Sequence, residues 1–300
     1  MEIIVLGAAA GGGFPQWNSN ASACNRARSG DPAAPARTQA SVAVSRDGER
    51  WFLLNASPDL RQQINETPAL YPRQGLRHSP IAGVVLTGGD VDVIAGLLTL
   101  RERQALTVHA TQRIHDVLDA NSIFEVLARD VVTRSVEALD ASFVLEEGLT
   151  ARFFAVPGKV PLYLESGSEP PPMVVDDTTV GLEIVEDGRR MIFIPGCAAM
   201  TPDLSGRLDG ADIVFFDGTL WRDDEMLEAG IGQKTGRRMG HMSLSGPEGT
   251  IEAFKPIRVG RKVIVHMNNS NPVLLADSVE RAEAEAAGWI IGHDGLAFTI

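Results

Sequence analysis

Strand-like segments recur along the whole chain, and this pattern limits the folds that the chain can adopt. Short runs of apolar and β-branched residues alternate with turn-forming residues from one end to the other. Asp47-Gly48 and Asp187-Gly188 each separate two such runs, which is typical of β-hairpins. The predicted strands are Ile3–Leu6, Ser41–Val44, Trp51–Leu54, Gly83–Leu86, Ala151–Val156, Gly181–Val185, Met191–Ile194, Ile213–Phe216 and Lys262–His266.

Helical patterns fall between these strands in both halves of the chain. One helix is predicted over Asp92–Arg103, and another begins after the N-cap Ser278 and stops at Gly288. Strands that pair first and then carry helices predict an α/β fold: a four-layer αββα sandwich of two mixed sheets with outer helices. Ser19–Arg37 and Glu165–Thr178 are predicted loops, too short to link domains, so we expect one domain over residues 1–300.

Composition limits the classes of partner and the cellular location that we expect for this protein. The chain has 300 residues, 44% of them hydrophobic and 22% charged, which is normal for a soluble protein. Its net charge of −12 argues against a nucleic-acid partner, because phosphates would be repelled. Without an apolar run long enough to span a bilayer or a signal-peptide pattern, we expect a cytoplasmic protein. Cys24 and Cys197 have no CxxC neighbour and are expected to be reduced thiols.

The segment Leu86–Leu97 carries the strongest chemical signal. An apolar strand ends in a polar turn that leads directly into a helix, and ligand sites gather at such strand ends. Asp90 and Asp92 are two residues apart, so both carboxylates could face one hard cation. They could equally cap the helix that begins here, and the spacing alone leaves both interpretations open.

This segment resembles the HxHxDH motif of the metallo-β-lactamase superfamily. In that register Gly88 replaces the first histidine, Asp90 replaces the second, Asp92 keeps the aspartate and Val93 replaces the last histidine. Asn55–Asp59 ends a strand in the way the first acidic motif of the superfamily does.

Two further strand ends extend the resemblance. Asp217 is similar to the bridging carboxylate of the superfamily, and His266 is similar to its last histidine ligand. The intermediate histidine would lie near Val156–Pro161, where this chain has none.

Longer segments resemble the coenzyme PQQ synthesis protein B (PqqB) family, where PQQ is pyrroloquinoline quinone. The resemblance runs through nearly the full chain, and the order of its segments is more specific than any one of them. These segments are Ala9–Asn18, Arg37–Gln39, Asn55–Asp59, Gly96–Glu102, Asp217–Trp221, Thr235-Gly236, Met239–His241 and His266–Pro272.

The chain departs from that family pattern at two places. Many members carry a three-cysteine motif that resembles a structural zinc site, where this chain has Ser19, Ala21 and Cys24. One thiolate cannot hold a tetrahedral zinc, so no structural cysteine–zinc site is expected. Many members also keep a histidine where this chain has Val93, which offers no lone pair to a metal.

The resemblance implies an iron-dependent oxygenase of PQQ biosynthesis that hydroxylates the tyrosine moiety of a Glu-Tyr-derived precursor. Asp90, Asp92, Asp217 and His266 would hold Fe(II), with Zn as the other candidate metal, and His241 and Asp90 would be catalytic. The alternatives are a non-catalytic binding or carrier protein for PQQ or its precursor, favoured by Val93, and a zinc-dependent hydrolase of the same fold.

Basic and amide side chains are candidates for holding the acidic ligand. Arginine matches carboxylates with two parallel hydrogen bonds, although a solvated loop would explain the same residues. The expected ligand is PQQ or its precursor, and homodimerisation is left open. Trp17 is expected to pack as a buried indole. The candidate ligand-binding residues are Arg37, Lys234, Arg237, Arg238, Asn268, Asn269 and Asn271.

Overall fold

Two seven-stranded mixed sheets form the centre of the molecule. In this computed structural model, residues 1–159 and 174–300 are described. The first sheet has the order β14-β1-β2-β3-β4-β5-β6, antiparallel from β14 to β3 and parallel from β3 to β6. Its strands are β1 (Glu2–Gly7), β2 (Ser41–Ser45), β3 (Trp51–Leu54), β4 (Ile81–Val85), β5 (Leu106–Ala110), β6 (Val132–Val136) and β14 (Ala297–Thr299).

The second sheet repeats the mixed arrangement. It has the order β13-β12-β11-β10-β9-β8-β7, parallel from β13 to β10 and antiparallel from β10 to β7. Both sheets are thus mixed, as predicted. The strands are β7 (Ser142–Glu146), β8 (Leu149–Ala155), β9 (Val180–Glu186), β10 (Arg189–Ile194), β11 (Ala211–Asp217), β12 (Val259–Val265) and β13 (Trp289–Ile291).

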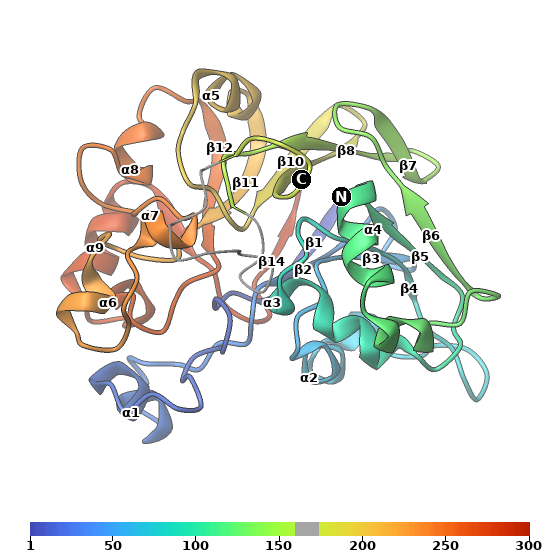
Figure 1. Cartoon of the computed structure of the whole chain (residues 1–300), viewed down its shortest axis with the longest axis horizontal. Coiled ribbons are helices and arrows are strands. Elements are labelled where there is room, and N and C mark those ends of the chain that lie inside the picture. The colour runs from blue at the N-terminus through green and yellow to red at the C-terminus, as the bar shows by residue number, and fades with distance from the viewer. Residues whose placement is uncertain (160–173) are drawn as a thin grey trace.

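Helices cover the outer faces of the two sheets. Figure 1 shows α2, α3 and α4 beside the first sheet and α6 to α9 beside the second, which completes the predicted αββα layers. No described helix is long and apolar enough to cross a membrane. The helices are α1 (Ser22–Arg28), α2 (Leu60–Glu66), α3 (Val91–Ile94), α4 (Gln112–Asp119), α5 (Pro202–Leu208), α6 (Glu225–Glu228), α7 (Gly236–Met239), α8 (Thr250–Ala253) and α9 (Val279–Ala286), with a 3₁₀ helix η2 (Ala95–Leu100) after α3.

The alternation of side chains along the strands divides the core. Val42 and Leu54 belong to the large apolar cluster that includes residues of both sheets. Ala43 and Leu53 point the other way, into a second cluster that includes Leu60 of α2.

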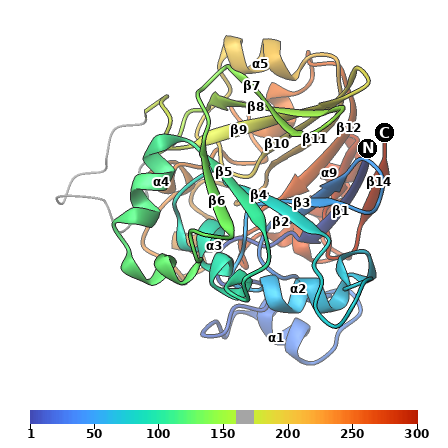
Figure 2. The same ribbon diagram turned by 90° about the vertical axis from the view of Figure 1, so that its right-hand side faces the viewer.

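The two edge strands β6 and β7 are consecutive in the chain and lie near one another in both views (Figure 1, Figure 2).

The structure corrects four expectations drawn from the sequence. Ser19–Arg37 is not all loop, because it contains the short helix α1. The helix predicted over Asp92–Arg103 is one turn of α-helix followed by 3₁₀ structure to Leu100. Trp17 is 84% exposed rather than packed. Five strands were missed, namely β5, β6, β7, β13 and β14. Most of the predicted loop Glu165–Thr178 lies outside the described residues.

The C-terminal helix is confirmed with both of its end signals. The Ser278 side chain accepts a hydrogen bond from the Arg281 backbone N–H and caps α9. Gly288 follows the helix with φ of 80°, the left-handed conformation that glycine adopts without strain.

Gly96 allows η2 to lie directly against the segment that follows β3. Its backbone N–H donates to the Ala56 carbonyl at 2.8 Å. A Cβ at this position would lie 2.1 Å from the Ser57 carbonyl oxygen and 2.7 Å from that of Ala56. Both neighbours are backbone atoms, so they cannot rotate away.

We therefore expect Gly96→Ala to lower the free energy of unfolding by about 2–4 kcal/mol, because the overlap forces η2 off its support. Gly206 in α5 is the matched control, since a Cβ there would meet nothing within 4 Å. Gly206→Ala should be neutral or stabilise the fold by up to about 1 kcal/mol. Urea unfolding of both variants measures the difference, and equal effects would contradict the packing argument.

Candidate metal centre

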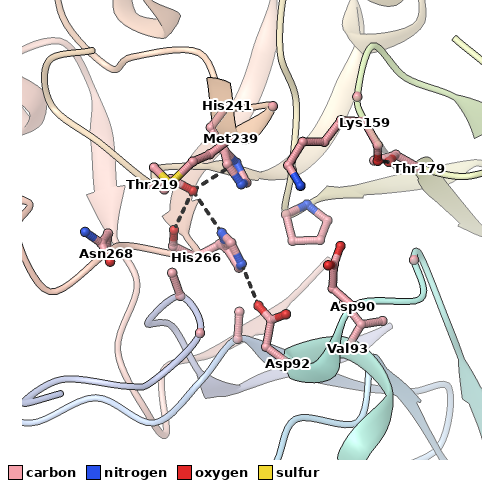
Figure 3. Close-up of a pocket in the computed structure, with 18 of the residues that line it drawn as sticks. Asp90, Asp92, Val93, Lys159, Thr179, Thr219, Met239, His241, His266 and Asn268 are labelled. Carbon is pink, nitrogen blue, oxygen red and sulfur yellow. Dashed lines mark hydrogen bonds and ion pairs between the residues drawn. The ribbon is translucent and has the colours of Figure 1, made fainter. Parts of the chain in front are cut away.

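A pocket of about 560 Å³ opens at the carboxyl ends of strands from both sheets. Residues that follow β3, β4, β8, β10, β11 and β12 line it. Polar side chains gather there because the carboxyl ends of parallel strands meet at one edge of a sheet. Figure 3 shows Asp90 and Asp92 projecting into this pocket from the start of α3, and His241 and His266 projecting into it from two other segments.

Asp217 ends β11 and is fully buried. Its Oδ1 accepts hydrogen bonds from the backbone N–H and the hydroxyl of Thr219, at 3.0 and 2.6 Å. Its Oδ2 accepts from the Cys197 N–H at 2.9 Å and lies 2.6 Å from His241 Nδ1. Burial alone would raise the pKa of Asp217, but the charge and hydrogen bond of His241, with further help from His266 and Thr219, lower it. The buried carboxylate is therefore held ionised.

His266 follows β12 directly and adopts a left-handed backbone with φ of 58°. Such a conformation is strained for a residue with a side chain and tends to occur at functional sites. Its Nδ1 lies 2.9 Å from Thr219 Oγ1 and 3.9 Å from Asp217 Oδ1. On the other side of the ring, Nε2 lies 2.9 Å from Asp92 Oδ2. The ring is thus fixed between Asp92 and Thr219.

His241 completes the cluster from the loop after α7. Its Nδ1 lies 3.0 Å from Thr219 Oγ1, in addition to its contact with Asp217. The rings of His241 and His266 stack with centroids 5.2 Å apart. One potential ligand atom from each of Asp217, His241 and His266 falls within 4.8 Å of the others. Among residues 1–159 and 174–300, this is the only such group of three or more metal-ligating side chains.

Asp92 was predicted to bind the metal directly. It is not part of the compact group of Asp217, His241 and His266, and its carboxylate pairs with His266. A carboxylate that accepts the proton of one imidazole nitrogen directs the other nitrogen toward the metal. Asp92 therefore orients His266 Nδ1 toward Asp217, and its role as a direct ligand stays a prediction.

The two aspartates fit the capping interpretation in part, since Asp92 lies in the first turn of α3, where a carboxylate favours the helix dipole. Asp90 occupies the N-cap position of α3, but its side chain makes no capping hydrogen bond. Its carboxylate instead lines the pocket, as Figure 3 shows. Val93, in the position where the superfamily has a histidine, also lines the pocket.

The predicted ligand-binding residues divide into two groups. Lys234 and Asn268 line the pocket. Asn269 does not, because its side chain bonds to Gln16 Oε1 and accepts from the Cys24 thiol. Asn271 is buried and donates to the Gly218 carbonyl, which joins the loops after β11 and β12.

The arginines that we predicted at the pocket are not among its lining residues. Arg37 is buried, and its guanidinium donates to the carbonyls of Gly292, Pro35 and Ala36. Arg237 is exposed and pairs with Glu248, and Arg238 does not line the pocket either. The guanidinium groups of Arg37 and Arg237 are therefore used in backbone and surface contacts of the protein itself.

Thr219 and Lys159 were missed by the sequence reasoning. Thr219 Oγ1 contacts Asp217, His241 and His266 together, and its only signal was its place two residues after Asp217. Lys159 lies in the segment where a histidine was expected. Neither cysteine joins the cluster, and burial raises the pKa of the Cys197 thiol to about 12, with the Asp217 charge as a second cause.

Comparison with known proteins identifies the family. Coenzyme PQQ synthesis protein B from Gluconacetobacter diazotrophicus is 63% identical, and the match covers 100% of this chain and 99% of that protein. The chain belongs to the coenzyme PQQ synthesis protein B family. A model described as a beta-lactamase superfamily domain also matches residues 50–267. The family and the fold predicted from the sequence are therefore confirmed.

Solved structures agree with this assignment. The crystal structure of Zn²⁺-bound PqqB from Methylobacterium extorquens is similar over 100% of both chains, with a TM-score of 0.98 and 53% sequence identity. A diphosphatase of the PhnP family has a TM-score of 0.70 at 19% identity, and covers 99% of this chain and 96% of its own. That likeness extends to the fold alone.

The Asp92–His266 pair gives a prediction for the metal-free protein. Burial opposes the imidazolium of His266, but the hydrogen bond and charge of Asp92, with the charges of Asp217 and Asp90, raise the pKa of His266 above its ordinary value. Burial likewise opposes the Asp92 carboxylate, and the same pair lowers its pKa. The ion pair therefore stabilises the fold at pH values above the ordinary pKa of an aspartate. This electrostatic stabilisation is lost as the pH rises through the raised pKa of His266.

We expect Asp92→Asn to lower the free energy of unfolding by about 3 kcal/mol near pH 5.5, and by less at a pH above the raised pKa of His266, where the imidazole has lost its proton. Urea unfolding in the presence of a chelator measures both values. Asp203→Asn, which removes an exposed ion pair with Arg207, is the control. It should change the free energy of unfolding little at either pH. An equal loss at both pH values for Asp92→Asn would contradict the charged pair.

Proposed function

We propose that this protein is a non-haem iron oxygenase of PQQ synthesis that hydroxylates the tyrosine ring of a Glu-Tyr-derived precursor. The observation that carries the proposal is the convergence of two imidazoles and one carboxylate, from His241, His266 and Asp217. Two histidines and one carboxylate with open positions are typical of Fe(II) oxygenases. Some catalytic zinc sites have the same three ligands, so zinc is the competing metal. His241 thereby becomes a proposed metal ligand, whereas the resemblance had implied a catalytic role for it.

The three side chains suit a divalent cation. Asp217 is ionised and held on both oxygens by Thr219 and Cys197. When His266 Nε2–H donates to Asp92, a proton on Nδ1 can be displaced by a metal, because metal binding and protonation compete for one lone pair. A bound Fe(II) would supply the redox chemistry that O₂ activation needs.

The rest of the pocket suits an aromatic, acidic ligand. Its volume of about 560 Å³ lies within the range of small-molecule sites. Met226 and Met239 give it an apolar wall, and Lys234 gives it a cation. We assign to Asp90 the acceptance of the proton of the substrate's ring hydroxyl, since its carboxylate projects into the same space.

Val93 favours a second candidate function, that of a carrier for PQQ or its precursor. Valine lines the pocket where family members often have histidine, so the pocket has one potential donor fewer. A carrier of this kind would retain the ligand pocket but would not hydroxylate the bound molecule. A zinc-dependent hydrolase of the same fold is the third candidate, and the zinc-bound relative makes zinc the competing metal.

Anaerobic titration with Fe(II) and Zn(II), followed by metal analysis, tests the proposal. We expect one Fe(II) per chain. With O₂ and an added two-electron reductant such as ascorbate, we expect hydroxylation of the ring of a synthetic Glu-Tyr-derived precursor, in which one oxygen atom enters the ring and the other leaves as water. Asp217→Asn, His241→Ala and His266→Ala should each lower Fe(II) affinity by more than about a hundredfold, because each removes a ligand. Asp203→Asn, exposed and distant in sequence from these residues, should bind iron like the wild type.

The other outcomes separate the three candidate functions. A protein that binds no metal but binds PQQ is a carrier. Hydrolysis of phosphodiester or lactam substrates by the zinc form, with no oxygen transfer by the iron form, supports the hydrolase. Full iron binding by His241→Ala would remove that residue from the ligand set.

A further inference from the structure

Lys159 projects into the same pocket from the loop after β8. Figure 3 shows its side chain reaching toward the space between His241 and Asp90. This is the segment in which the superfamily pattern led us to expect a metal-binding histidine. A lysine ammonium has no lone pair for a metal, so its contribution to the pocket is a positive charge.

The fold holds Lys159 in this position from three directions. The preceding Gly158 exchanges two backbone hydrogen bonds with Val174, at 2.9 and 3.0 Å. The Lys159 carbonyl accepts from the Thr179 hydroxyl at 3.2 Å. Its aliphatic stem lies over Gly240, where a Cβ would come within 3.0 Å of Lys159 Cγ. The ammonium is thereby directed beside His241, which follows Gly240.

The charges around the pocket explain what this lysine can bind. Among the described residues at the pocket, the charged side chains other than histidine are Asp90, Asp92, Lys159 and Lys234, with the buried Asp217 behind them. A divalent cation at the candidate centre would leave the set with a net positive charge. A pocket of this sign, partly withdrawn from solvent, attracts anions.

We propose that Lys159 is a specificity-determining residue that binds an acidic group of the ligand, on the side of the pocket formed by the loop after β8. The proposal rests on the proposed function only for the identity of the ligand, which is PQQ or its precursor. Lysine suits this role as a compact charge on a flexible stem whose base is fixed by the fold. In this chain a lysine lies in the segment Val156–Pro161, where the superfamily pattern led us to expect a metal-binding histidine.

The binding of PQQ, a tricarboxylate, and of its neutral trimethyl ester to the full-length protein tests this role. Lys159→Met keeps the length of the stem and removes the charge. We expect it to weaken PQQ binding by about tenfold or more and to reduce the dependence of the affinity on salt. Binding of the trimethyl ester should change by less than about threefold, because the ester has no carboxylate to lose.

Two further variants control for charge and for structure. Lys159→Arg should retain PQQ affinity within about threefold, since it restores the cation. Lys255→Met removes an exposed lysine that pairs with Glu252 and should have no effect. Equal weakening of PQQ and ester binding by Lys159→Met, or unchanged PQQ binding, would overturn the proposal, as would a wild-type protein that does not bind PQQ.

Metal analysis keeps this inference separate from the proposed function. Iron stoichiometry measured on the same Lys159→Met preparation should equal that of the wild type, because lysine is not a ligand. If the wild type binds no iron but shows the carboxylate-dependent loss of PQQ binding at Lys159, the oxygenase proposal fails and the assignment of Lys159 stands. If the wild type binds iron and Lys159→Met does not change PQQ binding, the assignment of Lys159 fails and the oxygenase proposal stands.

Discussion

The architecture of the site depends on one buried carboxylate. Asp217 lies at the end of β11 with no exposed surface, a position that would be unfavourable for an unpaired charge. Both of its oxygens are compensated by hydrogen bonds from Thr219 and Cys197 and by the imidazole of His241. Gly218 makes the arrangement sterically possible, since a Cβ there would lie 2.1 Å from Ile264 Cγ2 on β12. The close approach of β11 and β12 brings His266 to the same point.

The strands that build the site were predictable from the sequence, and several side-chain positions were not. β11 contains the continuous apolar run Ile213–Phe216 and ends at Asp217, and β12 ends in the run Val263–Val265 before His266. A short apolar run with a polar residue at its end was sufficient to find both strands. β6 and β7 contain exposed polar positions and lie at sheet edges, which weakens the apolar signal. His241 reaches the cluster through a loop, and no periodicity in the sequence specifies where a loop returns.

The chemistry of arginine side chains was not sufficient to predict which arginines line the ligand pocket. Arg37 has the right side chain for a carboxylate, but its guanidinium is used by three backbone carbonyls. Arg237 pairs with a glutamate on the surface. The sequence gives no measure of such competing partners. Lys159 was not predicted as a pocket residue. The superfamily pattern predicts a histidine in the segment Val156–Pro161, and this pattern assigns no role to a lysine there.

The pocket lies at the strand ends of a beta-lactamase superfamily fold, but its side chains differ from the histidine-rich pattern described above. Asp90, Val93 and Lys159 occupy places where the superfamily pattern has histidines or expects one nearby. Together they exchange imidazole donors for one negative charge, one apolar group and one positive charge. A single metal ion beside a charged ligand pocket suits this set of side chains better than two metal ions held by several histidines.

We propose that Asp217, His241 and His266 together hold one metal ion. Anomalous diffraction at the iron absorption edge, from crystals grown anaerobically with Fe(II), would locate that ion. We expect a single strong peak bonded to these three side chains, with Asp92 hydrogen-bonded to His266 and not bonded to the metal. A peak bonded to Asp92 and His266 without His241, or two peaks, would contradict it.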